Sequence, residues 1–451
     1  MMFRPARFIC QLTAGQTCTA SQPLLHPFKY RKRKISLLTR HYYRIDQSNR
    51  KSVAMAAAAS AEHQSNRKFQ FKKALIVTKL SRYEFEQHKN PKLTNFQLEK
   101  LLRDRGTDYD LWLHYHHIHK DFERKVADSF REHGIDVKLV NRVTLSTKQT
   151  EWADIVVPIG GDGTFLLTAS RACPIFCNTK PIIGFNSDPD RSEGRLMLSK
   201  RYSHEPNEAV RKLIQGEFEW LYRTRIRITM LGQNGNLPES FDLQELEPRR
   251  MELNEYPTEM LNEADGKKYR AKVKRILPYL ALNEVFIGET QSARVSHLHL
   301  QIDDQNILNK TKSSGLCVST GTGSSSWLTS INRLSKENVR ELLDLIKQNG
   351  INTHLNAEDI ADKYNARIMF PPDDPRLCYA IREQICVGVW PKPKGFESKG
   401  YAKNLLIKSR CIDASLVIDG SIAYPFNDGA KVLLEIHPED ALQTVVMTDE
   451  R

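Results

Sequence analysis

The sequence predicts an N-terminal doubly wound, Rossmann-like α/β domain followed by a β-rich, β-sandwich-like domain, and three observations lead to this prediction. Between residues 69 and 215, short continuous apolar runs alternate with helical patterns, as in buried parallel strands joined by helices. A glycine-rich segment directly follows one apolar run, where sheets of this class place their ligands. After residue 215 strand patterns dominate, which predicts a second domain over residues 216–430.

In the first domain, apolar runs predict strands and amphipathic patterns predict helices between them. Gly134 is a plausible end signal for the longest helix, because glycine readily takes the left-handed conformation there. The expected strands are 74–78, 137–140, 154–159 and 181–186, and the expected helices are 95–103, 110–132 and 165–172.

The second domain is expected to contain two insertions, over residues 233–266 and 335–400. The first is rich in Glu and Pro and predicts a surface loop. The second begins with a helical pattern between Ser335, a plausible N-cap, and Gly350. Residues 431–451 form a C-terminal segment that is a candidate for a return to the α/β domain. The expected strands are 223–230, 280–287, 297–302, 316–319, 405–409 and 414–418.

The positive charge of the chain is concentrated at its N-terminus. Residues 1–68 account for a net +11 of the total +13, with Asp46 and Glu62 as their only acidic residues. A basic segment poor in acids and rich in Ser, Thr and Ala is typical of a mitochondrial transit peptide, which predicts a location in the mitochondrial matrix. A disordered basic tail and a nuclear signal at Tyr30–Lys34 are the alternatives. The nearly neutral remainder argues against nucleic-acid binding.

Membrane insertion and a structural metal site are not expected. No apolar run approaches the ~18 residues that span a bilayer. The eight cysteines are scattered without a CxxC pair, which favours reduced and mostly buried thiols. The helix over 110–132 contains four histidines, but no carboxylate is placed to complete a ligand set, so we interpret them as surface and packing residues. The histidines are His114, His116, His117 and His119.

The segment Ile159-Gly160-Gly161-Asp162-Gly163-Thr164 is the strongest indication of chemistry. Glycines let the backbone pass close to a phosphate chain, their N–H groups can point toward it, and the following helix start adds positive dipole. A lone carboxylate beside a phosphate is electrostatically unfavourable unless it binds a metal ion or transfers a proton. The combination predicts phosphoryl transfer, although a plain tight turn remains the structural alternative.

Three further segments are candidates for ligand binding. Asn283 and Glu284 follow an apolar run, and an amide beside a carboxylate at a strand end can hold ribose hydroxyls and an adenine edge. Ser314–Trp327 is an apolar strand that enters a loop rich in Gly, Ser and Thr, suited to lining phosphate or ribose. Asp419-Gly420 ends a later strand and is weak evidence by itself.

Together, in this order, these segments resemble the NAD kinase family over roughly residues 70–430, and the run Gly184–Gly194 resembles its divergent mitochondrial branch. Gly321, Ser326 and Trp327 replace the Pro, Ala and Tyr usual in the family. Ser314 stands where most members have Asp, so no role is transferred to this position.

The resemblance implies an enzyme that uses ATP, with Mg²⁺ or another divalent cation, to phosphorylate the adenosine 2′-hydroxyl of NAD⁺. Asp162 would accept the proton of that hydroxyl. It also implies a homo-oligomer, and we expect a homodimer. The residues implied to bind NAD or ATP are Gly160, Gly161, Gly163, Thr164, Asn283, Glu284, Lys312, Thr322, Gly323, Ser324, Ser325, Ser326 and Trp327.

Two alternative functions remain open at this point. A lipid kinase of the diacylglycerol or sphingosine type uses a similar glycine loop, but there an Asn-Glu pair follows the loop almost at once, whereas Phe165 follows here. A sugar-phosphate kinase of the phosphofructokinase type lacks support, because its arginine pattern is missing. A non-catalytic NAD(P) sensor would keep the fold without the reaction.

Overall fold

The computed structural model describes residues 69–173, 180–235, 237–243, 258–303, 305, 307–386 and 396–450. The predicted leader over residues 1–68, together with Cys10, Cys18 and Cys177, lies outside these residues. Residues 68–451 form one compact unit. Of the described cysteines, Cys386 is exposed and the other four are buried, and none forms a disulfide.

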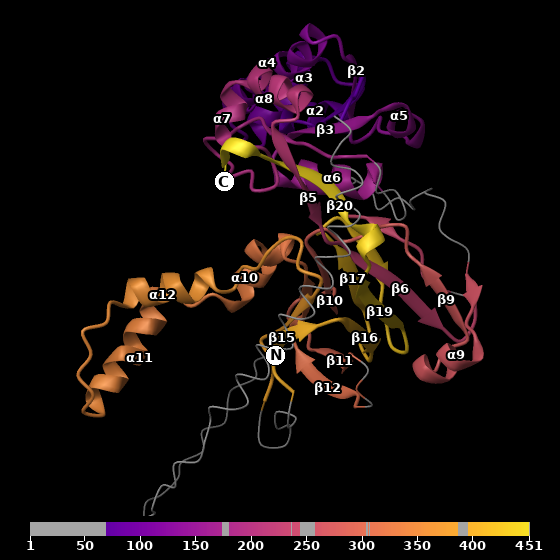
Figure 1. Ribbon diagram of the computed structural model, residues 1–451, viewed down its shortest axis with the longest axis vertical. Coiled ribbons are helices and arrows are strands. Elements are labelled where there is room, and N and C mark those ends of the chain that lie inside the picture. The colour runs from indigo at the N-terminus through magenta and orange to yellow at the C-terminus, as the bar shows by residue number, and fades with distance from the viewer. Residues whose placement is uncertain are drawn as a thin grey trace, which may run out of the picture. The chain divides into compact units, whose positions relative to one another are not determined.

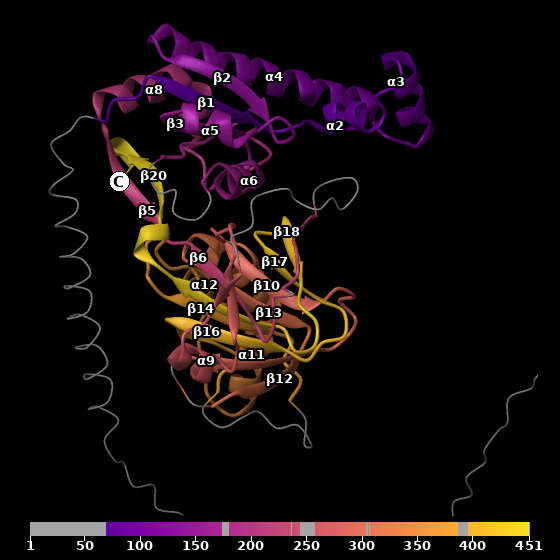
Figure 2. The same cartoon turned by 90° about the vertical axis from the view of Figure 1, so that its right-hand side faces the viewer.

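The first half contains a four-stranded parallel sheet with helices on both faces, as predicted for a doubly wound domain (Figure 1). Apolar residues of α4 (Tyr109–Glu132) and α8 (Pro206–Gln215) cover one face of the strands β1 (Lys73–Thr78) and β3 (Ile155–Gly160). Those of α6 (Asp162–Ala172) cover the other face (Figure 2). The strand order of the parallel sheet is β2-β1-β3-β4. Its strands are β1 (Lys73–Thr78), β2 (Asp136–Asn141), β3 (Ile155–Gly160) and β4 (Phe185–Asn186).

Several helices of this half begin or end at local sequence signals. Ser81 and Glu84 form a capping box that starts α2, a helix that the apolar pattern did not reveal. Gly134, with φ +74°, follows the end of α4 as expected. The helices are α2 (Arg82–Lys89), α3 (Asn95–Asp104), α4 (Tyr109–Glu132), α5 (Thr147–Trp152), α6 (Asp162–Ala172), α7 (Lys200–His204) and α8 (Pro206–Gln215).

The second half is a sandwich of two seven-stranded sheets that enclose one apolar core. The first sheet has the order β15-β14-β13-β10-β17-β18-β7, from β7 (Phe241–Asp242), β10 (Glu284–Glu289), β13 (Gly315–Ser319), β14 (Leu377–Arg382), β15 (Lys399–Ala402), β17 (Ala414–Ile418) and β18 (Ile422–Pro425). The second has the order β12-β11-β16-β19-β6-β9-β8, from β6 (Ile226–Gly232), β8 (Glu259–Met260), β9 (Val273–Ile276), β11 (Ser296–Ile302), β12 (Asn309–Ser313), β16 (Asn404–Ser409) and β19 (Lys431–Ile436).

The ranges expected as insertions contain both helices and sheet strands. α9 (Glu263–Tyr269) begins at the end of the first range and extends three residues beyond it. The second range contains α11 (Lys336–Gln348) and α12 (Ala357–Ala366), which pack on each other through Val339, Leu343 and Ala361. It also contains β14, which pairs with β13 inside the sheet, so this part is not inserted. The strand escaped the sequence analysis because it directly follows a Pro-rich, charged stretch.

The C-terminal segment contributes to both halves. β19 belongs to the sandwich, whereas β20 (Leu442–Met447) pairs with β5 (Phe218–Arg223). Leu442, Val445 and Met447 are buried in the apolar clusters around the parallel sheet. Within the described residues, no helix combines the length and the apolar character that crossing a bilayer requires.

Candidate functional site

The glycine-rich segment forms the turn between β3 and α6, at the carboxyl end of the parallel sheet. Gly161 is the N-cap, and Asp162 is the first residue of α6. The Asp162 carboxylate accepts two backbone hydrogen bonds, from Arg195 N–H at 3.1 Å and from Leu196 N–H at 2.8 Å. Both carboxylate oxygens are therefore held by the loop that follows β4, and the side chain has a defined orientation.

The three glycines of this turn have different surroundings. A Cβ on Gly160 would lie 2.3 Å from Thr164 Oγ1, and one on Gly161 would lie 3.2 Å from Ser192 Oγ. A Cβ on the exposed Gly163 would meet nothing within 4 Å. Gly160 is thus required by packing inside the protein, whereas Gly163 leaves open space at the N-terminus of α6. This helix end offers unpaired N–H groups to an anion.

Asn283 and Glu284 present buried polar atoms that lack partners. Their side chains are 7% and 4% exposed, and neither Asn283 Oδ1 nor Glu284 Oε2 finds a hydrogen-bond partner among the described residues. Burial, followed by the nearby charge of Asp419, raises the pKa of Glu284 to about 8. Glu284 is therefore mostly protonated at neutral pH and can donate a hydrogen bond. Unsatisfied buried groups of this kind indicate a ligand site.

Asp419 holds the backbone at this position. Its carboxylate accepts hydrogen bonds from the N–H groups of Leu282, Asn283 and Glu284, at 2.8, 2.8 and 3.0 Å. Burial raises the pKa of Asp419 to about 6, although these three hydrogen bonds act in the opposite direction. The Asp419-Gly420 turn, weak as sequence evidence, therefore orients the Asn-Glu pair.

The second Gly/Ser/Thr loop packs directly against Asn283. Thr320 N–H donates to the Asn283 carbonyl at 2.9 Å, and a Cβ on Gly323 would lie only 2.2 Å from the same oxygen. The loop continues as a 3-10 turn, Thr322–Ser325, and then as α10 (Trp327–Asn332). Trp327 is 46% exposed, with Phe286 5.8 Å away between ring centroids.

Arg223, which the sequence analysis missed, connects the two loops. Its Nη1 lies 3.5 Å from Thr322 Oγ1, and the charge of Asp162 acts on its guanidinium. Burial lowers the pKa of Arg223 to about 10, while Asp162 opposes this shift. Its buried Nε has no hydrogen-bond partner among the described residues. No motif marks Arg223, which is one basic residue in the run Arg223-Thr224-Arg225.

Lys79 adds a second cation beside the glycine turn. Lys79 directly follows β1, and a Cβ added to Gly160 would lie 3.3 Å from the Cβ of Lys79. Burial lowers the pKa of Lys79, with Asp188 and Arg191 acting in opposite directions. Nearby, the buried His119 lies 2.8 Å from Thr78 Oγ1, and burial lowers the pKa of His119 to about 3. His119 is thus a neutral packing residue, as expected for this helix.

The structure brings most of the implied residues into two connected groups. The first contains Gly160, Gly161, Asp162, Gly163 and Thr164 at the start of α6. The second contains Asn283 and Glu284 with the loop that includes Thr322, Gly323, Ser324, Ser325, Ser326 and Trp327. Lys312 lies in β12, opposite His297 of β11, and is part of neither loop.

Two curated relatives are similar to this chain over most of their length. A rat protein named NAD kinase 2, mitochondrial (Rattus norvegicus), is 38% identical over 387 residues, which cover 84% of this chain and 88% of that protein. Its human counterpart (Homo sapiens) is also 38% identical and is covered to 85%. The crystal structure of yeast NADH kinase complexed with NADH matches with a TM-score of 0.46 and 14% identity, over 84% of each chain. No family model matches the chain.

Proposed function

This chain belongs to the NAD kinase family, and we propose that it transfers the γ-phosphoryl group of ATP to the adenosine 2′-hydroxyl of NAD⁺ in mitochondria, which forms NADP⁺ and ADP. Three contacts carry the assignment of the site. Arg223 contacts the loop at Thr322 and is within reach of the charge of Asp162, while Gly323 packs on Asn283. These contacts join the proposed proton acceptor to the proposed dinucleotide site.

Asp162 is the proposed proton acceptor. A ribose hydroxyl is a far weaker acid than a carboxylic acid, so the proton moves late in the transition state. The two backbone hydrogen bonds from Arg195 and Leu196 hold the carboxylate, which lets it orient the hydroxyl toward the phosphoryl group. Phosphoryl transfer depends mainly on such positioning and on charge neutralisation.

The surrounding groups are proposed to bind the two substrates. Gly163 and the N-terminus of α6 face the phosphates, and Arg223 and Lys79 supply positive charge. Asn283 and the protonated Glu284 bind the adenosine part of NAD⁺. ATP arrives as its complex with Mg²⁺ or another divalent cation, which bridges the phosphates. Among the described residues, no three His, Cys, Asp or Glu side chains are grouped to hold a metal.

The assembly is proposed to be a homodimer. α11 exposes Leu342, Leu345 and Ile346, which share one side of the helix, and Leu355 is also exposed. This apolar side of α11 supports an interface with a second copy of the chain. The molar mass measured by light scattering distinguishes a dimer from the 51.9 kDa monomer.

The decisive experiment measures NADP⁺ formation from ATP and NAD⁺ by the purified protein. Asp162→Asn should lower kcat by about 10²–10⁴-fold with little change in KM for NAD⁺, because it removes the proton acceptor and keeps the shape. The matched control is Asp190→Asn, which removes an exposed carboxylate paired with Lys200. Its kcat should equal that of the wild type.

Three outcomes would contradict the proposal. Wild-type kcat in Asp162→Asn would exclude Asp162 as the proton acceptor. Phosphorylation of diacylglycerol in place of NAD⁺ would identify a lipid kinase, and tight NAD⁺ binding without turnover would identify a sensor.

A further inference from the structure

The second sheet of the sandwich has a basic outer face. Side chains of β11 alternate, so that Leu298, Leu300 and Ile302 enter the core while His297 and His299 point outward. Asn283 and Glu284, in contrast, lie at the start of β10 in the other sheet. The basic face therefore belongs to a different part of the fold from the proposed active site.

Basic residues stand directly opposite one another across four strands of this face. His299 pairs with Lys310 of β12 on one side and with Lys408 of β16 on the other. Lys408 in turn pairs with Lys431 of β19. Like charges in directly opposed positions of a sheet are destabilising. The directly opposed Lys408 and Lys431 are therefore unfavourable in the free protein, and an anion bound over these strands would relieve their repulsion.

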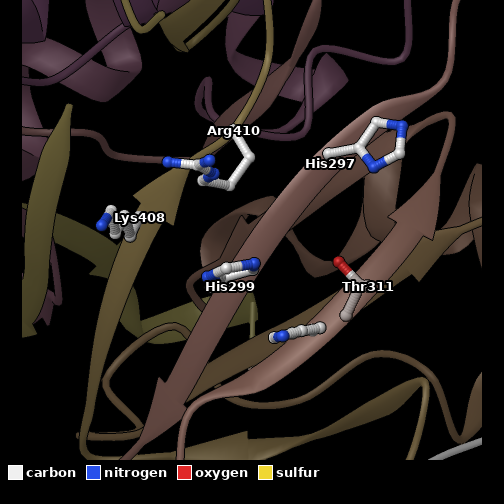
Figure 3. Close-up of a pocket in the computed structure, with 6 residues that line it drawn as sticks. His297, His299, Thr311, Lys408 and Arg410 are labelled. Carbon is white, nitrogen blue, oxygen red and sulfur yellow. The ribbon is translucent and has the colours of Figure 1, made fainter. Parts of the chain in front are cut away.

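A cavity of about 310 Å³ lies over this row of residues (Figure 3). Figure 3 shows Lys408 on one strand with Arg410 near its end, His297 and His299 on the next strand, and Thr311 on a third. The cavity is lined by His297, His299, Lys310, Thr311, Lys408 and Arg410. Five of the six side chains can be cationic, whereas Thr311 is buried and its hydroxyl donates to the Leu298 carbonyl at 3.0 Å.

Few acidic groups oppose this charge. Asp428 lies 3.0 Å from Arg410, and both side chains are about half exposed. Glu289 lines a neighbouring cavity, where it pairs with Arg294 at 3.6 Å and accepts hydrogen bonds from the N–H groups of Ile412 and Asp413. No described carboxylate forms an ion pair with His299, Lys310 or Lys408.

His299 responds to this surplus of charge. Burial, and then the charges of Lys310, Lys408 and Arg410, lower the pKa of His299, while Asp428 acts in the opposite direction. His299 is therefore neutral in the free protein at neutral pH. A bound anion would reverse the effect of the cations and favour the protonated ring.

We propose that this cavity is a binding site for a polyphosphate anion, separate from the active site. A chain of phosphates concentrates several negative charges in a compact volume, which matches several cations around one small cavity better than a single carboxylate does. Lysines bind phosphate as point charges, and the arginine can form two parallel hydrogen bonds with it. The phosphates can be inorganic or part of a nucleotide, since the chemistry of recognition is the same.

The test is calorimetric titration of the purified protein with sodium tripolyphosphate, and separately with ATP, at low salt. Lys310→Gln/Lys408→Gln should weaken tripolyphosphate binding at this site about tenfold or more, since it removes two charged hydrogen-bond donors. Added NaCl should weaken wild-type binding, because salt screens the attraction. Lys336→Gln/Lys363→Gln, at exposed positions of α11 and α12, makes the same change in net charge and should bind like the wild type.

Each outcome decides the proposal. A loss confined to tripolyphosphate identifies an inorganic ligand, and the additional loss of one equivalent of ATP shows that nucleotides bind as well. Equal binding by the wild type and the double variant overturns the proposal, as does an equal loss in the control pair. NADP⁺ formation and the Tm without ligand should not fall in the double variant, because the substitutions relieve repulsion. If its Tm falls, the exposed single substitution Lys310→Gln repeats the titration.

Discussion

At the scale of single residues, Arg223 places a positive charge between Asp162 and the loop at Thr322. We predict that Arg223→Met lowers kcat/KM for ATP about 10- to 100-fold, since a charge-assisted contact is lost where the phosphoryl group is transferred. Arg223→Lys should recover part of the activity, because it keeps the charge but not the planar donor group. Steady-state kinetics and Tm, measured together, check the prediction.

Arg124→Met is a suitable control for Arg223, because it removes an exposed arginine of α4 whose one ion pair within the described residues is with the exposed Asp121, one helical turn away. It should leave both quantities unchanged. A fall in Tm for Arg223→Met with unchanged kinetics would show that Arg223 is structural.

Glu284 predicts a specific dependence of stability on pH. Its pKa is about 8 in the folded protein against an ordinary value of 4.5, so the folded chain keeps a proton that the unfolded chain releases. The stabilisation is complete below about pH 4.5 and is lost as the pH rises to about 8. The Glu284→Gln variant has no carboxyl group to ionise and therefore does not lose stability in this way. Its free energy of unfolding should exceed that of the wild type by up to a few kcal/mol at pH 9.

Urea unfolding at pH 5, 7 and 9 measures this difference for Glu284→Gln. Asp419 is present in both proteins, so its own titration largely cancels. Glu341→Gln, at an exposed position of α11, should show no such trend. A constant difference between Glu284→Gln and the wild type across this range would mean that Glu284 is ionised in the folded protein.

At the scale of secondary structure, an added methyl group is expected to lower the Tm at a glycine of one loop and to leave it unchanged at a glycine of the other. Gly323→Ala should raise KM for NAD⁺ and lower Tm, because the new Cβ would lie 2.2 Å from the backbone oxygen of Asn283. Gly163→Ala has open space around it and should keep the wild-type Tm. If Gly163→Ala loses activity while keeping its Tm, the added methyl group obstructs a bound ligand and does not disturb the fold. Melting curves and steady-state kinetics of both variants test this contrast. A wild-type KM and Tm in Gly323→Ala would refute it.

The sequence predicts these elements unevenly, for physical reasons. Buried parallel strands such as β3 are continuous apolar runs, and α4 and α11 have clear end signals, so their positions follow from local patterns. α2 buries only Tyr83 and Glu86 and has no apolar periodicity, and β14 adjoins a Pro-rich stretch. Whether these two segments form a helix and a strand depends on packing partners that are distant in the sequence.

The candidate site shows the same division. Asp162, Asn283 and Glu284 stand out in the sequence because their residue types and neighbours imply chemistry. The roles of Arg223 and Asp419 depend on contacts across 99 and more than 130 residues. No local pattern indicates that Asp419 holds the Asn-Glu backbone or that Arg223 lies beside Asp162. These residues could be found only from the folded chain.

At the scale of the whole molecule, β20 joins the two halves and predicts that they unfold together. Met447 is fully buried beside the parallel sheet, while Asp440, just before β20, pairs with Arg227 of the sandwich at 2.6 Å. Met447→Ala should therefore destabilise the entire described unit by about 2–5 kcal/mol.

Calorimetry should show one transition for Met447→Ala at a lower Tm, because the halves share this strand. The neighbouring Val446→Ala, at a half-buried position, should shift Tm much less. Two separate transitions in Met447→Ala, with the sandwich keeping its wild-type Tm, would show that β20 stabilises the α/β half alone.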